Sequence, residues 1–178
     1  IFHVLYKNSG DPLQYVSQNR LAEILNAVND LYKDRSNSIG MNLTFTLAAT
    51  NPNGETLTSP GVEYIEWPDS YPIDCNAFMS DNTGKNVKYL WDPNQYINVM
   101  IYNFTSDPET NSITLGISHL PFTTTGNNSL EGLNETKYSY LELKNLNFPY
   151  CCSINSLYID QQSTSTTYNT TDVTVTVA

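Results

Sequence analysis

Few residues of this sequence have the chemistry of a catalytic or metal-binding site. The 178 residues include two histidines, His3 and His119, and no HExxH, GxSxG, Walker or GxGxxG pattern. A catalytic zinc ion needs three protein ligands, and two scattered histidines make no such set. His3 falls inside an apolar strand pattern, which favours a structural histidine whose ring nitrogens are hydrogen-bonded. We therefore predict no catalytic residue and no metal ligand in this chain.

The acidic residues are scattered rather than paired. Glu63 and Glu66 flank one predicted strand, and Asp69 follows it. Facing carboxylates can act as general acid and base, but the sequence places no second group opposite these three. A solvated surface on an acidic protein, whose formal net charge is −10, is the favoured interpretation.

The cysteines make an odd set of three: Cys75, Cys151 and Cys152. In an oxidising compartment Cys75 could form a disulfide with Cys151 or with Cys152, whereas two adjacent cysteines seldom bridge each other because the geometry is strained. Three buried free thiols are the alternative, and both stay open. The spacing of the three fits no zinc ribbon or redox motif.

Composition limits the classes of partner. Hydrophobic residues make up 39% and charged residues only 15% of the chain, a profile that fits an extracytoplasmic protein. Lysine and arginine total 8 and form no cluster, so we expect no nucleic-acid binding. No stretch is apolar for long enough to span a membrane. The chain opens in the middle of a strand pattern, so we expect it to be trimmed at the front, and a missing export signal says nothing about location.

Hydrophobic periodicity predicts the elements that would position these residues. Residues 1–7 read as a strand with apolar side chains on both faces, as in a central strand that is covered on both sides. Residues 17–35 carry an apolar stripe at helical spacing, with Ser17 as the N-cap. The stripe consists of Leu21, Ile24, Leu25, Val28, Leu31 and Tyr32. Further strands are expected at 41–50, 61–67, 97–104, 112–122 and 151–160.

A single α/β (α+β) domain accounts for this order of elements. A strand, a helix and then several strands with long connections predict an α/β unit on a mixed sheet. One helical turn is expected at 74–82, and residues 123–136 are predicted to form a polar loop. No internal repeat or linker divides the chain, so one domain over 1–178 is expected.

Several segments together resemble a known family. "IFHVLYK", "YVSQNRLAEILNAVNDLYK", "MNLTFTLA", "LWDPNQYINVMIYNF", "LGISHLPF" and "CCSINSLYI" occur in the order and spacing of the N-terminal half of a pappalysin-like metzincin, most closely the bacterial zinc-dependent metalloproteinase lipoproteins. The resemblance implies a mixed, twisted five-stranded sheet with one antiparallel edge strand and a backing helix. That sheet would be the N-terminal (upper) subdomain of a metzincin-like catalytic domain, truncated before the zinc-binding helix.

The same resemblance implies a function. The parent protein would be a hydrolase, a zinc metalloendopeptidase that cleaves peptide bonds with a zinc-activated water, and this chain alone would be inactive. Its edge strand would bind extended polypeptide substrate by strand addition. The matching positions are Leu115, Gly116, Ile117, Ser118, His119, Leu120 and Pro121.

The resemblance also implies partners and a location. The zinc ligands and the general base would lie in an HExxHxxGxxH helix in the missing C-terminal half of the same catalytic domain. "TDVTVTVA", residues 171–178, would form the first turns of that helix, capped by Thr171 or Asp172, although Val and Thr are weak helix formers. The protein would lie in the bacterial cell envelope, as an outer-membrane lipoprotein, or be secreted. It would contact a membrane only through a lipid anchor outside this chain.

A non-enzymatic surface module, such as an adhesin or a glycan-binding domain, is the alternative. The 13 tyrosines of the chain, its low fraction of charged residues and its polar loops favour this alternative. This alternative predicts a closed β-sandwich with aromatic residues gathered in one groove. A third interpretation, a viral or eukaryotic glycoprotein domain, rests only on five N-x-S/T stretches, several of which chance would produce in a chain so rich in Asn and Thr.

Overall fold

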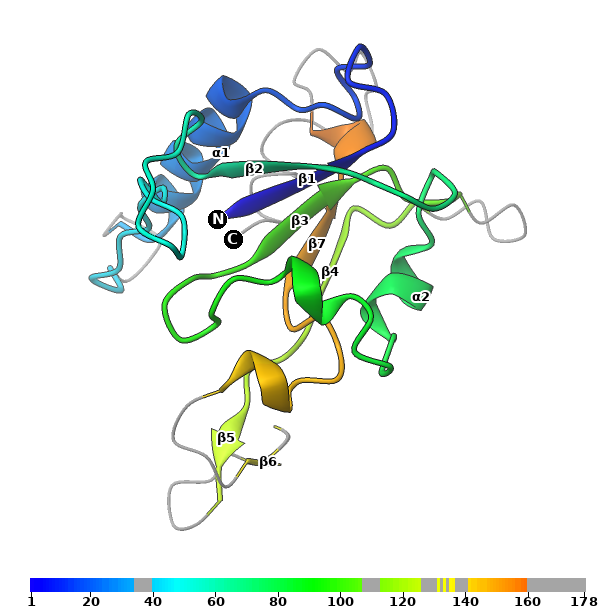
Figure 1. Ribbon diagram of the computed structural model, residues 1–178. Coiled ribbons are helices and arrows are strands. Elements are labelled where there is room, and N and C mark those ends of the chain that lie inside the picture. Colours follow the sequence, from blue (N-terminus) through cyan, green and yellow to red (C-terminus); the bar gives the residue numbers. More distant parts are fainter. Residues whose placement is uncertain are drawn as a thin grey trace.

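The structure is a computed structural model that describes residues 1–33, 40–106, 113–125, 131, 133, 135–136 and 141–159. Figure 1 shows its elements. In chain order they are β1 (Phe2–Tyr6), α1 (Gln18–Leu31), β2 (Val62–Glu66), α2 (Cys75–Met79), η1 (Val87–Tyr89), β3 (Val99–Tyr102), β4 (Gly116–Ser118), β5 (Thr123–Thr124), β6 (Glu135–Thr136), η2 (Leu143–Asn145), β7 (Cys152–Asn155) and η3 (Ser156–Tyr158).

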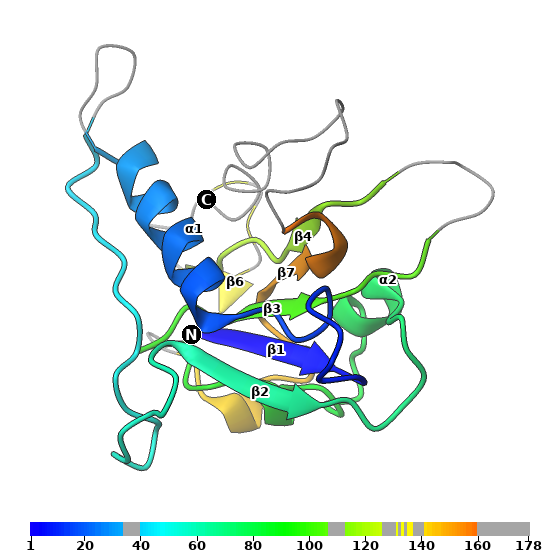
Figure 2. The same ribbon diagram turned by 90° about the horizontal axis from the view of Figure 1, so that it is seen from above.

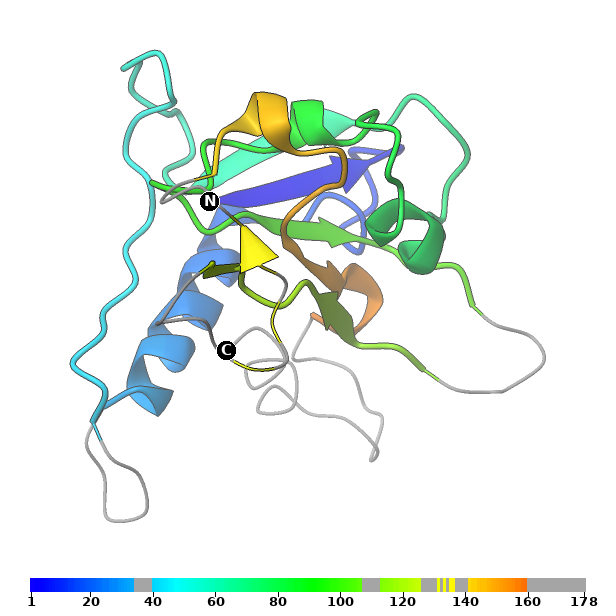
Figure 3. The same ribbon diagram turned by 90° about the horizontal axis from the view of Figure 1, so that it is seen from below.

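The centre of the molecule is a five-stranded mixed sheet with the strand order β2-β1-β3-β7-β4. The pairs β2–β1, β1–β3 and β3–β7 are parallel, whereas β4 runs antiparallel to β7 at the edge of the sheet. Figures 2 and 3 show β4 beside β7 from opposite sides. The predicted α/β class and the mixed five-stranded sheet with one antiparallel edge strand are therefore confirmed.

Helix α1 covers one face of this sheet. The Ser17 side chain accepts a hydrogen bond from the Arg20 N–H and caps the helix as predicted. Leu21, Ile24 and Val28 of the predicted stripe are buried against the sheet. The helix ends at Leu31, whose side chain is 37% exposed. Helix α1 and the sheet face beneath it form the first apolar cluster of the protein. Its buried members are Phe2, Val4, Val16, Leu21, Ile24, Val28, Val62, Val99, Ile101, Ile154 and Ile159.

A second apolar cluster covers the opposite face of the sheet. Leu5 of β1 and Met100 and Tyr102 of β3 are completely buried there, beneath the short helix α2. The Asp74 carboxylate accepts a hydrogen bond from the Ala77 N–H and starts α2 in the region where one helical turn was predicted. Burial of each large apolar side chain contributes about 1.5–3 kcal/mol. Cover on both faces explains why β1 is apolar at successive positions.

The strand predicted at 41–50 is wrong. Residues 40–48 form no sheet ladder, and Thr50 makes one isolated bridge with Thr56. The Asn29 side chain of α1 takes the place of a strand partner. Its Oδ1 accepts a hydrogen bond from the Phe45 N–H at 2.7 Å, and its Nδ2 donates to the Phe45 carbonyl at 2.9 Å. In Figure 2 this segment runs beside α1, while β2 occupies the sheet position next to β1.

Other predictions needed smaller corrections. The region 123–136, predicted to be a loop, contains β5 and β6, which pair in parallel over two residues each. The predicted helix start at 171–178 lies outside the described residues. Within the described parts of the chain, the helices are too short or too polar to cross a lipid bilayer.

Gly61 provides a test of how the segment before β2 is packed. Its φ is +75°, and a Cβ at this position would lie 2.4 Å from Leu47 Cδ2. Gly54 has a similar φ of +84° with no atom within 4 Å of such a Cβ. Both alanine substitutions carry a backbone cost of about 1–2 kcal/mol, and Gly61→Ala adds an overpacking cost of about 1–3 kcal/mol.

We therefore expect Gly61→Ala to lower the unfolding free energy clearly more than Gly54→Ala. Urea denaturation of both variants measures the difference. Equal losses of stability would contradict the close packing of Leu47 on Gly61.

Candidate functional site

The seven residues predicted to bind substrate lie at and beside the edge strand. Gly116, Ile117 and Ser118 form β4, and one ladder bond extends it at each end. The Asn155 N–H donates to the Leu115 carbonyl at 2.8 Å, and the His119 N–H donates to the Cys151 carbonyl at 3.2 Å. Leu120 and Pro121 follow the strand, and Leu120 is 67% exposed.

The register of β4 decides which of its backbone groups are available to a ligand. Gly116 lies opposite Ile154 and Ser118 opposite Cys152. In an antiparallel pair, alternate residues direct both backbone groups to the partner strand. The bonds at both ends assign that role to positions 115, 117 and 119. Gly116 and Ser118 therefore direct their N–H and C=O groups away from β7, and in the described part of the chain β4 pairs with no other strand.

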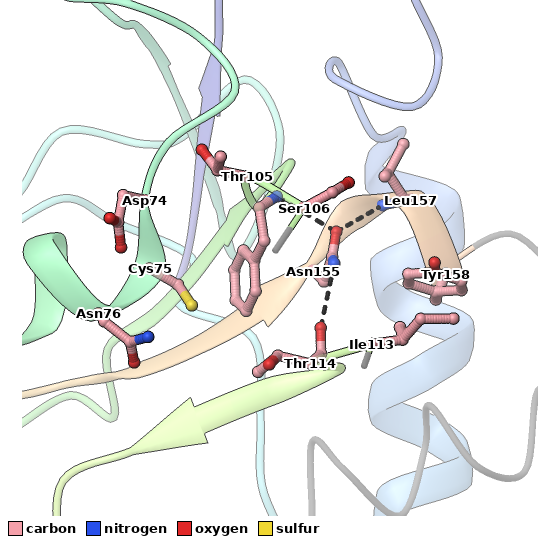
Figure 4. Close-up of a pocket in the computed structure, with 11 residues that line it drawn as sticks. Asp74, Cys75, Asn76, Thr105, Ser106, Ile113, Thr114, Asn155, Leu157 and Tyr158 are labelled. Atoms are coloured by element: carbon pink, nitrogen blue, oxygen red, sulfur yellow. Dashed lines mark hydrogen bonds between the residues drawn. The ribbon is translucent and has the colours of Figure 1, made fainter. Parts of the chain in front are cut away.

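Asn155 anchors the segment that leads into β4, and the sequence analysis did not identify this residue. Its side chain is buried, and its Nδ2 donates to the Thr114 carbonyl at 3.0 Å. Its Oδ1 accepts from the backbone N–H groups of Phe104 and Leu157. Figure 4 shows this amide between the ends of β3 and β7 and the start of β4. The sequence signal available was only a polar residue inside an apolar strand pattern.

A large polar cavity adjoins the N-terminal end of β4 (Figure 4). Its volume is about 610 Å³, and Asp74 is the charged residue among the described residues that line it. Burial raises the pKa of the Cys75 thiol in its wall, which disfavours the reactive thiolate form. The lining residues are Asp74, Cys75, Asn76, Phe104, Thr105, Ser106, Ile113, Thr114, Asn155, Leu157 and Tyr158.

A smaller cavity of about 220 Å³ adjoins the C-terminal end of β4. Residues from β4, from the start of β7 and from the loop that enters β3 form its wall. No lysine, arginine, aspartate or glutamate is among them. They are Pro93, Tyr96, Ile97, Asn98, Ser118, His119, Tyr150, Cys151 and Cys152.

The two histidines lie in separate structural environments. His3 is fully buried, with Nδ1 2.7 Å from Glu63 Oε2 and Nε2 2.9 Å from Asn98 Oδ1. Both ring nitrogens are thus within hydrogen-bond distance of a side-chain oxygen. His3 is thus a structural residue, as predicted. The His119 ring packs on Phe148 with 4.9 Å between ring centroids, and its Nδ1 is buried without a hydrogen-bond partner.

The acidic residues considered in the sequence do not form a pair. The Glu63 carboxylate is engaged by His3 and also accepts from Trp91 Nε1 at 3.2 Å. The Asp69 carboxylate lies 2.7 Å from the Lys85 ammonium, and the hydrogen bond from Lys85 lowers the pKa of Asp69. Within the described ranges, no three His, Cys, Asp or Glu side chains lie together so that they could hold a metal ion. The described residues therefore do not fit a zinc site.

Of the two alternatives for the cysteines, the disulfide between Cys75 and Cys151 or Cys152 is absent, and all three cysteines are free thiols. Cys151 packs against Met79, with 3.7 Å between the two sulfur atoms, in the apolar cluster that also contains Cys75. Cys152 is the next residue, so its side chain points to the other face of the sheet. The structure thus contains free thiols, of which Cys75 and Cys151 are buried and Cys152 is partly exposed.

The buried thiols make the stability of the fold sensitive to alkaline pH. Burial raises the pKa of Cys151 from 9.0 to about 12 and that of Cys152 from 9.0 to about 11. Above a pH of about 9 the unfolded chain releases thiol protons that the folded chain still holds, so the unfolding free energy falls as the pH rises. Each thiol contributes at most about 1.4 kcal/mol per pH unit until the folded thiol also ionises.

We expect Cys151→Ala to reduce this alkaline slope, whatever it does to stability at neutral pH. Urea denaturation between pH 8 and about pH 10.5 measures the slope for both proteins. Identical slopes would show that the Cys151 thiol does not titrate differently in the two states.

The role of Asn155 gives another test. Asn155→Ala removes one buried and two part-buried hydrogen bonds to backbone groups, and an unsatisfied buried group costs about 1–3 kcal/mol. We expect a large loss of stability, together with faster amide hydrogen exchange at Leu115 and Ile117 than elsewhere in the sheet. The exposed loop residue Asn53 provides the control substitution, Asn53→Ala. Uniformly faster exchange across all strands would argue against a specific anchor for β4.

Comparison of the chain with protein-family models and with curated proteins finds no match.

Proposed function

We propose that this chain forms the substrate-binding wall of a zinc-dependent metalloendopeptidase of the pappalysin-like metzincin type, and that extended polypeptide binds to β4 by strand addition. The observation that carries the proposal is the outer edge of β4. Its Gly116 and Ser118 direct backbone donors and acceptors away from β7, as a peptide strand would require. A cavity lies at each end of this short edge, where side chains of a bound peptide could be placed.

The arrangement of the sheet supports the same proposal. The sequence resemblance implies an antiparallel edge strand at 115–121, and β4 lies within those residues at the edge of the sheet. It also implies a helix behind the sheet, the place that α1 occupies. Neither feature is specific to peptidases, because one fold serves many functions. The outward-directed backbone groups of Gly116 and Ser118 are what favours a peptide ligand.

In this proposal the chain orients the substrate and performs no bond cleavage. Main-chain hydrogen bonds from β4 would hold the polypeptide extended, which lowers the entropy cost of placing the scissile bond. Zinc would activate the hydrolytic water in the parent enzyme. Since the described residues do not fit a zinc site, we assign no chemical step to them. The metal ligands and the general base would come from the remaining half of the catalytic domain, outside this chain.

The proposed location is the bacterial cell envelope, through a lipid anchor outside this chain, or the extracellular medium. The low fraction of charged residues supports it. The partners would then be the polypeptide substrate and the second half of the catalytic domain.

A surface binding module is the second candidate. An aromatic cluster next to β4 favours it, because the rings of His119, Phe122, Phe148 and Tyr150 lie 4.9–6.4 Å apart between centroids. The predicted β-sandwich is not what the described residues form, since they fold as one five-stranded sheet with a covering helix and a separate two-residue pair. Specific binding on a glycan array would favour this second candidate.

The parent protein tests the peptidase proposal. We expect its reading frame to encode HExxHxxGxxH after Ala178, and the whole protein to bind one zinc ion and to cleave an unfolded polypeptide. We expect this chain by itself to bind no stoichiometric zinc and to cleave nothing. Elemental analysis and a peptide-cleavage assay of both proteins measure these outcomes. A stop codon directly after Ala178, or cleavage by the isolated chain, would refute the proposal.

Strand addition has its own test. A fluorescent peptide scanned with single N-methyl groups loses one N–H donor at a time. We expect methylation to weaken binding to this chain at every second residue, because alternate peptide residues face β4. Fluorescence anisotropy measures the affinities. The same loss at consecutive positions, or no loss at any, would exclude binding by strand addition.

A further inference from the structure

We propose that the smaller cavity, at the C-terminal end of β4, is a subsite for one uncharged, apolar side chain of the peptide bound on that strand. This inference rests on the proposed strand addition and names the substrate residue that the site would select. Three observations carry it: the residue rows that form the cavity, the chemistry of its wall and its size.

The cavity adjoins two rows of residues at the end of the sheet where β3 and β7 begin and β4 ends. Val99, Cys152 and Ser118 form one row across β3, β7 and β4. The next row toward the cavity contains Asn98, Cys151 and His119, joined by backbone hydrogen bonds from Cys152 to Asn98 and from His119 to Cys151. The smaller cavity touches every member of these rows except Val99. A peptide strand beyond β4 would extend the same rows by one residue each.

The described wall of the cavity has no carboxylate, ammonium or guanidinium group that would balance a charge. Its imidazole, His119, packs on Phe148. The buried Asn98 amide has no hydrogen-bonding group left for a ligand. Its Oδ1 accepts from the Trp91 N–H and faces His3. Its Nδ2 donates to the carbonyls of Trp91 and Tyr96. Burying an unpaired charge is very unfavourable. The described wall offers no carboxylate to a cation, so the cavity discriminates against Lys and Arg side chains.

The size and the rim of the cavity favour a single apolar side chain. Its volume of about 220 Å³ is below the roughly 300–1,000 Å³ of typical small-molecule sites. Tyr96 and Tyr150 provide aromatic surface inside, and Ile97 at the rim is 61% exposed. Leu120, just after β4, is 67% exposed. Both exposed side chains could add apolar contact to a bound peptide side chain.

The register identifies the peptide residue. In an antiparallel addition, the peptide residue opposite Ser118 places its side chain on the same face as Ser118 and Cys152. Both of those residues line the cavity. The residue opposite Gly116 lies two positions toward the peptide C-terminus and farther from the cavity, so we expect it to tolerate charge.

Matched peptides test this subsite on the same chain. The N-methyl scan first establishes the register. Peptides that differ only in the residue opposite Ser118 then carry Leu, Phe, Asp or Lys there. We expect the Leu and Phe peptides to bind roughly 10- to 100-fold more tightly than the Asp and Lys peptides, as burial of one apolar side chain predicts. The same substitutions opposite Gly116 should change affinity by less than about threefold.

Two variants with similarly exposed side chains complete the test. Ile97→Asp places a charge at the cavity rim and should remove the preference for Leu over Lys. Met41→Asp alters a side chain that is 60% exposed beside α1, away from β4, and should leave the preference unchanged. If the N-methyl scan shows strand addition but all four residues bind equally, the subsite is wrong and strand addition stands. If no peptide binds, or the scan lacks its alternation, both proposals fail.

Discussion

The need to cover β1 and β3 on both faces determines most of this structure. Val4 and Leu5 are adjacent in sequence and point to opposite faces, and both are completely buried, as are Met100 and Ile101. Both faces of β1 and of β3 must therefore be covered by other parts of the protein. Helix α1 covers one face and α2 with its flanking loops covers the other. Strands β2, β7 and β4 extend the sheet outward from this pair, so that β4 is left at one edge.

Side-chain amides complete the hydrogen bonding where strand ladders stop. Asn155 pairs with backbone groups at the ends of β3, β4 and β7, Asn98 does so at the entry to β3, and Asn29 does so for residue 45. Each amide offers both donors and an acceptor, so one side chain can replace a missing strand neighbour. Asn155 and Asn98 order loops at the two ends of β4, and each of them lines one of the two cavities beside that strand.

The edge strand connects this architecture to the proposed function. A strand held firmly on one side by β7 has fixed backbone groups on the other, and a peptide that binds there pays little for ordering the protein. Backbone pairing by itself is indifferent to sequence, so selectivity must come from the places that receive side chains. The polar cavity and the smaller, uncharged cavity differ in chemistry at the two ends of the same strand, which gives a bound peptide a direction as well as a register.

Local signals in the sequence determined β1, α1 and its Ser17 cap, the turn at α2, and the strands β2, β3, β4 and β7, because periodicity, capping and apolar runs act over a few neighbouring residues. The location of residues 115–121 at an antiparallel edge came from the family resemblance, not from periodicity. Only the tertiary structure decided that β2 lies next to β1 at the outer edge of the sheet. The alternating pattern of 41–50 is as strand-like as that of β2, but only one segment can occupy that position. The tertiary structure alone also revealed the pairing of His3 with Glu63 and Asn98, the anchoring role of Asn155, the free thiols and the two cavities. All of these depend on contacts between residues distant in sequence, which no local pattern encodes.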